Sequence, residues 1–114
     1  MNDYIKKDYK EFNEIMNNVL FNKVDKLCND LTNKYNETWD HDKVAFTYKE
    51  GRKYIKIIET NKEGKHRSAW GFIKYNGDVL MASTWSRPAK HSRGNIIDGY
   101  EITGSRIYGP DYLR

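Results

Sequence analysis

Apolar residues in the first third of the chain recur at steps of three and four, which is the period of one face of an α-helix. The apolar positions are Ile5, Tyr9, Phe12, Met16, Val19, Leu20, Val24, Leu27, Cys28, Leu31 and Tyr35. The stripe drifts near Asn17-Asn18 and Asn22, so the pattern allows either one bent helix or two helices. We therefore predict a helical region over residues 1–36, followed by a polar connector up to residue 42.

From residue 44 onward, apolar and polar residues alternate, which is typical of β-strands. The alternation predicts strands at 44–48, 54–58, 66–75 and 78–84, with a further short strand near 101–108. Asn76-Gly77 is a strong hairpin signal because both residues tolerate a positive φ. Helix first and strands afterwards favours an α+β domain, with an N-terminal helix or helix pair and an antiparallel β-meander of four to five strands. At 114 residues the chain is expected to form a single domain, 1–114.

Charge is distributed unevenly along the chain, although the net charge is only +4. Residues 1–42 hold 6 Lys/Arg and 9 Asp/Glu, a net of −3, whereas residues 43–114 hold 14 and 7, a net of +7. We expect the second part to face an anion. The hydrophobic share of 38% is low for a domain of this size, so we also expect self-association as a homo-oligomer.

Cysteine use and hydropathy predict a protein of the cytoplasm. Cys28 is the single cysteine, so no internal disulfide can form. No apolar run approaches 18 residues, and the N-terminus lacks the pattern of a signal peptide, so we expect no membrane span. Asp40-His41-Asp42 offers three potential metal ligands, but neighbours on an extended chain point to opposite faces. We expect no metal and no cofactor.

The segment from Thr84 to Asn95 carries most of the candidate chemistry, and we predict a ligand-binding loop over residues 84–95. Its candidate ligand-binding residues are Trp85, Arg87, Lys90, His91, Arg93, Gly94 and Asn95. Guanidinium and ammonium groups match phosphate oxygens, and an indole offers a flat face on which a base stacks. The Asn95 amide can both donate and accept, and Gly94 lets backbone N–H groups approach an oxyanion. The alternative interpretation is a solvated basic connection whose tryptophan packs on the sheet.

Part of this region resembles a pattern found in short phage proteins. The resemblance extends over residues 70–95, with the matching runs Trp70-Gly71-Phe72-Ile73, Asn76-Gly77-Asp78-Val79-Leu80, Ala82-Ser83-Thr84-Trp85, Pro88-Ala89-Lys90-His91 and Arg93-Gly94-Asn95. They resemble the phage Thoeris anti-defence sponge family of the first-described type, whose members sequester cyclic ADP-ribose isomers made by bacterial immune TIR enzymes. The resemblance covers about a quarter of the chain. It implies a protein of the host bacterial cytoplasm that binds such a messenger without cleaving it.

The resemblance also implies roles for particular residues. Trp85 and Asn95 fall on ligand contacts of the family, and Arg93 falls on the arginine of the motif. The sequence departs at Ser86-Arg87, where the family pattern has Lys-Ala, and this puts the role of Arg87 in doubt. The family further implies assembly into dimers and larger rings, some of which also bind cyclic oligonucleotides. Arg106 in the tail is a candidate for a further phosphate contact, as are Arg52 and Arg67 at predicted strand edges.

Two other functions stay open on the sequence. A basic half with tryptophan and tyrosines would suit single-stranded nucleic acid, but the cations concentrate in one segment and the net charge is modest, so DNA and RNA are not favoured. A hydrolase of the same messenger would need a nucleophile and a base. Ser83 or Thr84 with His91 would provide them, but no acidic residue stands out to orient the histidine. We therefore expect a binding protein, with hydrolysis as an open alternative.

Overall fold

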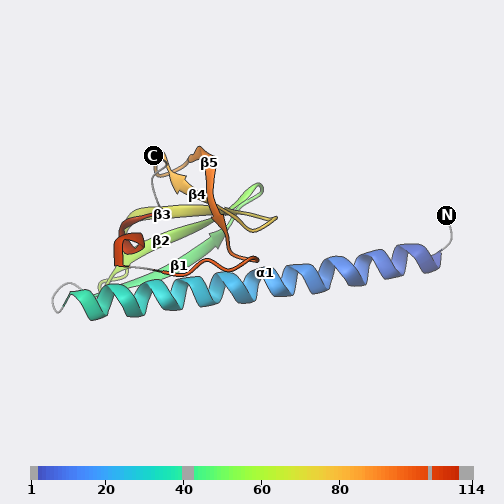
Figure 1. Ribbon diagram of the computed structural model, residues 1–114, viewed down its shortest axis with the longest axis horizontal. Coiled ribbons are helices and arrows are strands. Elements are labelled where there is room, and N and C mark those ends of the chain that lie inside the picture. Colours follow the sequence, from blue (N-terminus) through green and yellow to red (C-terminus); the bar gives the residue numbers. More distant parts are fainter. Residues whose placement is uncertain (1–2, 40–42, 103, 111–114) are drawn as a thin grey trace.

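The chain folds as one long helix followed by a five-stranded antiparallel sheet (Figure 1). The computed structural model describes residues 3–39, 43–102 and 104–110. The elements are α1 (Asp3–Thr38), β1 (Val44–Glu50), β2 (Tyr54–Asn61), β3 (His66–Lys74), β4 (Asp78–Ala82), β5 (Pro88–Asn95) and the 3-10 helix η1 (Gly104–Tyr108). The predicted α+β class with an antiparallel meander is confirmed. Within the described part of the chain, no helix is apolar enough over a sufficient length to cross a membrane.

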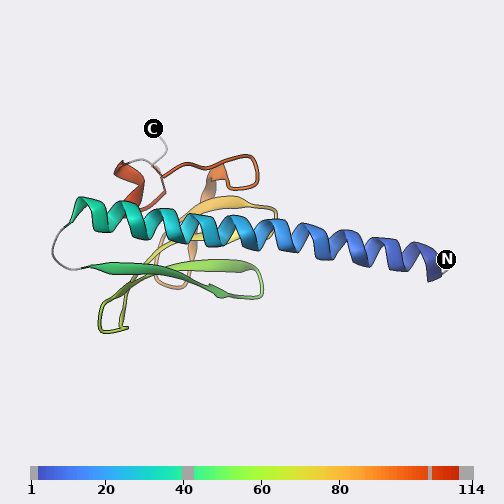
Figure 2. The ribbon, with the colours of Figure 1, turned by 90° about the horizontal axis from the view of Figure 1, so that it is seen from below.

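Helix α1 runs for 36 residues without a break, so the asparagines near its middle do not divide it. Its C-terminal half packs on the sheet, whereas its N-terminal half extends past the sheet into solvent (Figures 1 and 2). The buried helical side chains are Leu20, Val24, Leu27, Cys28, Leu31 and Tyr35. The apolar stripe predicted from the sequence therefore passes from exposed to buried between Val19 and Leu20.

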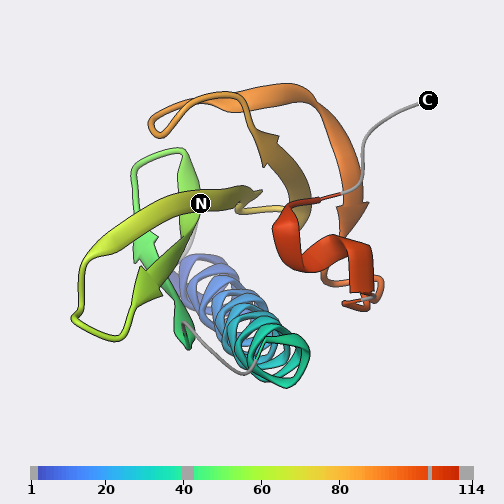
Figure 3. The ribbon, with the colours of Figure 1, turned by 90° about the vertical axis from the view of Figure 1, so that its left-hand side faces the viewer.

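The strands lie in the order β1-β2-β3-β4-β5, and each is antiparallel to its neighbour. Gly77 adopts φ 97° in the turn between β3 and β4, where the sequence predicts a hairpin. Viewed along α1, the sheet curls strongly, so that β1 and β2 lie near the helix while β4 and β5 rise away from it (Figure 3). The curl gives the sheet a helix-facing side and an outer side.

The core lies between α1 and the helix-facing side of the sheet. Its sheet residues include Val44, Phe46, Ile55, Ile57, Ile73 and Val79. Two polar side chains fasten the edge strand β1 to the helix. The Asn36 amide pairs with both the N–H and the carbonyl of Val44, at 2.9 Å each, and Thr32 Oγ1 accepts the Phe46 N–H at 2.9 Å. These bonds satisfy backbone groups that an open sheet edge would leave unpaired.

The C-terminal third differs from the sequence prediction in two ways. Residues 84–95 do not form a loop: Ser83–Arg87 form a turn, and residues 88–95 form the edge strand β5. The described residues of 101–108 include no strand: 101 and 102 lie outside any element, and 104–108 adopt the 3-10 helix η1. Trp70 Nε1 donates to the Arg106 carbonyl at 2.7 Å, and Ile107 is buried in the core. This segment caps the core rather than extending the sheet.

Cys28 is a buried core thiol, and burial together with nearby Asp25 raises its pKa to about 12. Because the thiolate is the reactive form, we expect the folded protein to resist alkylation by iodoacetamide at pH 8. The unfolded protein in guanidinium chloride should be alkylated stoichiometrically, as mass spectrometry would report. Rapid labelling of the native protein would contradict this placement of Cys28.

Candidate functional site

The Trp85 side chain lies in the turn after β4 and is 44% exposed. Two side chains from other strands meet its indole ring. Lys56 Nζ, from β2, lies 4.0 Å from the ring centroid, and the His66 ring, from β3, stacks at 5.7 Å with an interplanar angle of 30°. The curl of the sheet thus gathers an aromatic plate, an ammonium and an imidazole from three segments distant in sequence.

A cleft of about 240 Å³ adjoins this group on the outer side of the sheet. Its lining residues are Lys49, Glu50, Gly51, Arg52, Lys53, Tyr54, Lys56, Phe72 and Ser86. Four of these carry a positive charge and one carries a negative charge. The Tyr54 and Phe72 rings, 5.9 Å apart and nearly perpendicular, supply the apolar part of the lining. We call the group formed by this cleft with Trp85 and His66 the outer-face cluster.

Lys56 is the positively charged residue of the outer-face cluster that contacts the Trp85 ring. Partial burial lowers its pKa below the ordinary lysine value, and the positive charge of Lys49 lowers it further. Among the described residues Lys56 makes no ion pair, and its Nζ lies near the faces of Trp85 and Phe72. Such an ammonium gains more from an incoming anion than one that is already paired.

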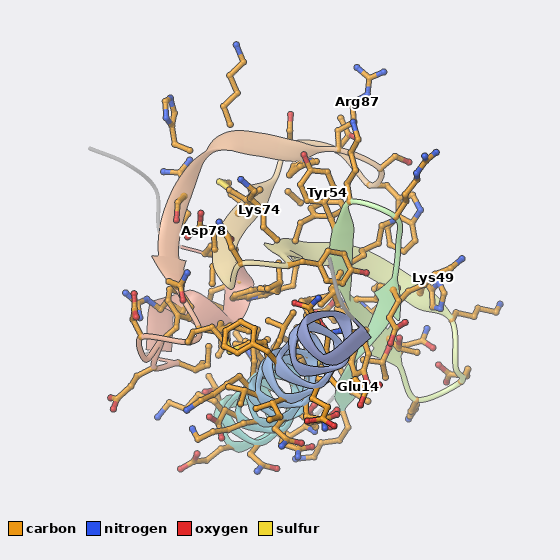
Figure 4. The ribbon with its side chains drawn as sticks, turned by 90° about the vertical axis from the view of Figure 1, so that its right-hand side faces the viewer. Glu14, Lys49, Tyr54, Lys74, Asp78 and Arg87 are labelled. Carbon is orange, nitrogen blue, oxygen red and sulfur yellow. The ribbon has the colours of Figure 1, made fainter. Side chains whose placement is uncertain are left out.

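The predicted cations of 84–95 point mainly into solvent. Arg87 closes the turn through its backbone: its carbonyl accepts from Ser83 N at 2.9 Å and Thr84 N at 3.1 Å. In Figure 4, Tyr54 lies on the side of the sheet facing this turn, and the Arg87 side chain extends away from the sheet. Lys90 and His91 are exposed on β5. Arg87 thus follows the cleft-lining residue Ser86 directly in the sequence but is not itself among the residues that line the cleft.

Arg93 lies on the other side of the sheet from Trp85. Its Nη2 is 4.0 Å from Met81 Sδ, and Met81 pairs with Gly71. Phe72 lies on the outer side of the sheet, where Lys56 Nζ contacts its ring. Consecutive strand residues alternate between the two sides and paired residues of adjacent strands share a side, so Gly71 and its partner Met81 belong to the opposite side. The Nε and Nη1 atoms of Arg93 are buried without a hydrogen-bond partner. The structure therefore does not bring Trp85 and Arg93 into one site.

Asn95 is held by bonds within its own chain. Its Nδ2 donates to the Asn76 carbonyl at 3.1 Å and to Asp78 Oδ1 at 3.0 Å, and its Oδ1 accepts from Ile97 N at 2.8 Å and Asp98 N at 3.3 Å. Both N–H donors and both acceptor positions of the side-chain amide are therefore engaged. The side chain locks the end of β5 to the β3–β4 turn.

Gly94 and Arg106 also make their contacts within the chain, and both pack against the Tyr100 ring. Gly94 has φ 150°, and a Cβ at this position would lie 2.6 Å from the Tyr100 ring. The Arg106 guanidinium lies 4.2 Å from the centroid of the same ring and donates to the Glu101 carbonyl at 2.6 Å. These residues build the connection between β5 and η1.

The remaining candidates are divided by the structure. Arg52 lines the cleft, whereas Arg67 pairs with Glu59 at 3.3 Å. Thr84 Oγ1 accepts from Ser86 N and Arg87 N, and within the described residues no hydrogen bond joins His91 to Ser83 or Thr84. Asp40-His41-Asp42 lies outside the described residues.

Sequence reasoning identified Trp85 but missed Lys56 and His66. The available signal was weak: Tyr54 and Lys56 alternate with Ile55 and Ile57, which places them together on the side opposite the core. Nothing in the spacing along the chain connects that pair to residue 85.

The comparison with protein families finds a model that matches most of the chain. The model of a family of unknown function, DUF7717, matches residues 1–105. The chain belongs to this family. The DUF7717 match includes α1, all five strands and the whole outer-face cluster, so the candidate site lies within the region that defines the family. No curated protein and no solved structure matches the chain.

Proposed function

We propose that this DUF7717 protein binds an anionic nucleotide at the outer-face cluster and sequesters it without cleaving it. The proposed ligand is a cyclic ADP-ribose-type immune messenger, and the proposed role is that of a phage protein that blocks Thoeris immunity in the host cytoplasm. The resemblance of the segment around Trp85 to phage sponges suggests the messenger. The chemistry of the outer-face cluster supports the ligand class.

The observation that carries the proposal is the exposed indole with an ammonium 4.0 Å from its centre, beside a cleft lined by three further cations. A cyclic ADP-ribose isomer combines a flat adenine base and two riboses with a pyrophosphate. Stacking of a base on an aromatic side chain contributes ~1–3 kcal/mol in single-strand binders. Pairing of phosphate oxygens with lysine and arginine adds orientation and charge neutralisation.

In the proposed complex the base takes the Trp85 face that Lys56 now covers. The ammonium then moves from the ring to the pyrophosphate, and Lys49, Arg52 and Lys53 line the path of the phosphates. This exchange replaces a cation–π contact with a charge-assisted hydrogen bond, which is the stronger interaction. Sequestration at nanomolar affinity requires about −12 kcal/mol, which demands contacts to base and phosphates together.

The test separates a sponge from an enzyme. The protein is incubated with cyclic ADP-ribose isomers, free ligand is removed, and the protein is heat-denatured before the supernatant is analysed by mass spectrometry. Recovery of the intact cyclic nucleotide supports sequestration, whereas a linear product identifies a hydrolase. Absence of any retained nucleotide, with cyclic oligonucleotides tried as a second probe, overturns the proposal.

Binding of single-stranded nucleic acid is a second candidate, favoured by the open position of Trp85 at 44% exposure and by the cations of the β1–β2 hairpin beside it. Stacking and backbone charge are the means by which such strands bind without sequence preference. This function predicts binding to a random 20-nucleotide DNA strand that weakens steeply with salt. The proposed sponge should instead ignore that strand at 150 mM salt.

A further inference from the structure

The turn between β1 and β2, residues 51–53, carries two of the cations that line the cleft, Arg52 and Lys53. The last pair of the β1–β2 ladder is Glu50 with Ile55, so the turn residues lie beyond the ladder. Within the described residues neither cation makes an ion pair. The position of these two charges therefore depends on what fixes the backbone of the turn. We call residues 51–53 the cationic turn.

Two hydrogen bonds fix the cationic turn in the part of the chain that the structure describes, and both are made by Gly51. Its N–H donates to the Tyr54 carbonyl at 2.8 Å, which closes the hairpin. Its carbonyl accepts from Tyr75 Oη at 2.6 Å. Tyr75 belongs to the β3–β4 turn, which lies at the same end of the sheet as the cationic turn (Figure 1). One tyrosine hydroxyl thus joins the cationic turn to a turn that is distant in sequence.

The β3–β4 turn is itself held firmly, so it can serve as an anchor. The Gly77 N–H donates to the Lys74 carbonyl at 2.8 Å, and the Gly77 carbonyl accepts from the Ile96 N–H at 2.9 Å. Tyr75 is 41% exposed and is not among the residues that line the cleft, whereas Gly51 is. Any influence of Tyr75 on a molecule in the cleft therefore passes through the backbone of Gly51.

We propose that Tyr75 is a positioning residue of the outer-face cluster, whose hydroxyl holds the cationic turn so that Arg52 and Lys53 meet the phosphates of the bound nucleotide. This inference rests on the proposed function, because it assigns a task within the same cleft. Backbone that is fixed before binding reduces the conformational entropy that is lost when a ligand binds. Without the Tyr75 bond, one hydrogen bond remains in the cationic turn, and the nucleotide has to order the turn as it binds.

Tyr75→Phe tests the proposal, because it removes the hydroxyl and keeps the ring. Amide hydrogen exchange in the cationic turn, followed by nuclear magnetic resonance without ligand, should become faster than in the wild type. The affinity for a cyclic ADP-ribose isomer, measured by calorimetry, should fall about 2- to 13-fold, the equivalent of one hydrogen bond. Tyr108→Phe is the matched control: its hydroxyl accepts from Trp39 Nε1 at 3.2 Å, outside the cleft, and both quantities should stay at the wild-type value.

A double-mutant cycle shows whether Tyr75 acts through the cationic turn. In a background of Arg52→Gln and Lys53→Gln the turn has no charge left to position, so Tyr75→Phe should cause no further loss of affinity. Residues that act through one another are non-additive in this way, whereas independent effects add. The same fold loss in both backgrounds would show that Tyr75 acts elsewhere, and would overturn the proposal.

The two readouts also separate this inference from the proposed function. If the wild type binds the nucleotide and Tyr75→Phe binds it equally well, the positioning role fails while the proposed function stands. Unchanged hydrogen exchange in Tyr75→Phe overturns the anchor itself, whatever the affinity. If the wild type binds no nucleotide, the proposed function fails and the positioning role fails with it, although faster exchange would still establish the anchor.

Discussion

Replacement of Trp85 by alanine is expected to weaken binding of a cyclic ADP-ribose isomer about 5- to 160-fold, which corresponds to the ~1–3 kcal/mol of stacking that one base contributes. The indole is the face on which the base is proposed to lie, and it also positions Lys56 Nζ, 4.0 Å from the ring centroid. Because the side chain is 44% exposed, its loss should leave the melting temperature nearly unchanged. Isothermal titration calorimetry and thermal melting would measure the two effects separately.

Trp39 provides the matched control, since it is similarly exposed at 47% and lies at the end of α1, where its Nε1 donates to Tyr108 Oη. Trp39→Ala should bind the ligand as the wild type does. Lys56→Gln should weaken binding as well, because it removes the cation without removing the ring. Equal affinity in Trp85→Ala and the wild type would show that the outer-face cluster is not the binding site.

Asn95→Ala is expected to destabilise the protein by about 2–3 kcal/mol, because it removes four hydrogen bonds worth ~0.5–1.5 kcal/mol each and leaves partly buried partners unpaired. For a domain of this size that loss lowers the melting temperature by roughly 10 °C. Ligand affinity of the folded fraction should change little, since the amide is committed to the β3–β4 turn. Thermal melting and calorimetry below the transition would report both quantities.

This prediction separates the structure from the sequence motif. If Asn95 contacted the ligand, as the resemblance implies, the alanine variant would keep its stability and lose affinity. Lys90→Ala is a suitable control on the same strand, because Lys90 is exposed and should leave stability unchanged. A stable Asn95→Ala variant with strongly reduced binding would contradict the structural role assigned here.

The strands that the sequence predicts well are those with an apolar side facing the helix. Val44, Phe46, Ile55 and Ile57 alternate with polar residues, and each is buried in the core. Strand β5 carries no such pattern: Lys90, His91 and Ser92 are consecutive exposed residues on a sheet edge. Its pairing with β4 is set by the turn at Ser83–Arg87 and by the Asn95 bonds, which hydrophobic periodicity does not report.

The candidate site can be predicted only in part from the sequence, because its residues come together through the pairing of strands that are distant in sequence. Trp85 is conspicuous by its residue type, but its neighbours Lys56 and His66 reach it only through the register and curl of the sheet. Arg93 and Asn95 belong to the same sequence run as Trp85, yet strand alternation and local bonding direct them elsewhere. Because consecutive residues of a strand point to opposite sides of the sheet, a cluster in the sequence of a strand is divided between those two sides.

A crystal structure of the protein grown with a cyclic ADP-ribose isomer would test the central claim most directly. We predict density for the nucleotide with its base on the Trp85 ring and its pyrophosphate within 3.5 Å, the usual hydrogen-bonding limit, of Lys56 Nζ, displaced from the indole. Density for the nucleotide at Arg93 and Asn95, with the Trp85–Lys56 contact intact, would contradict it.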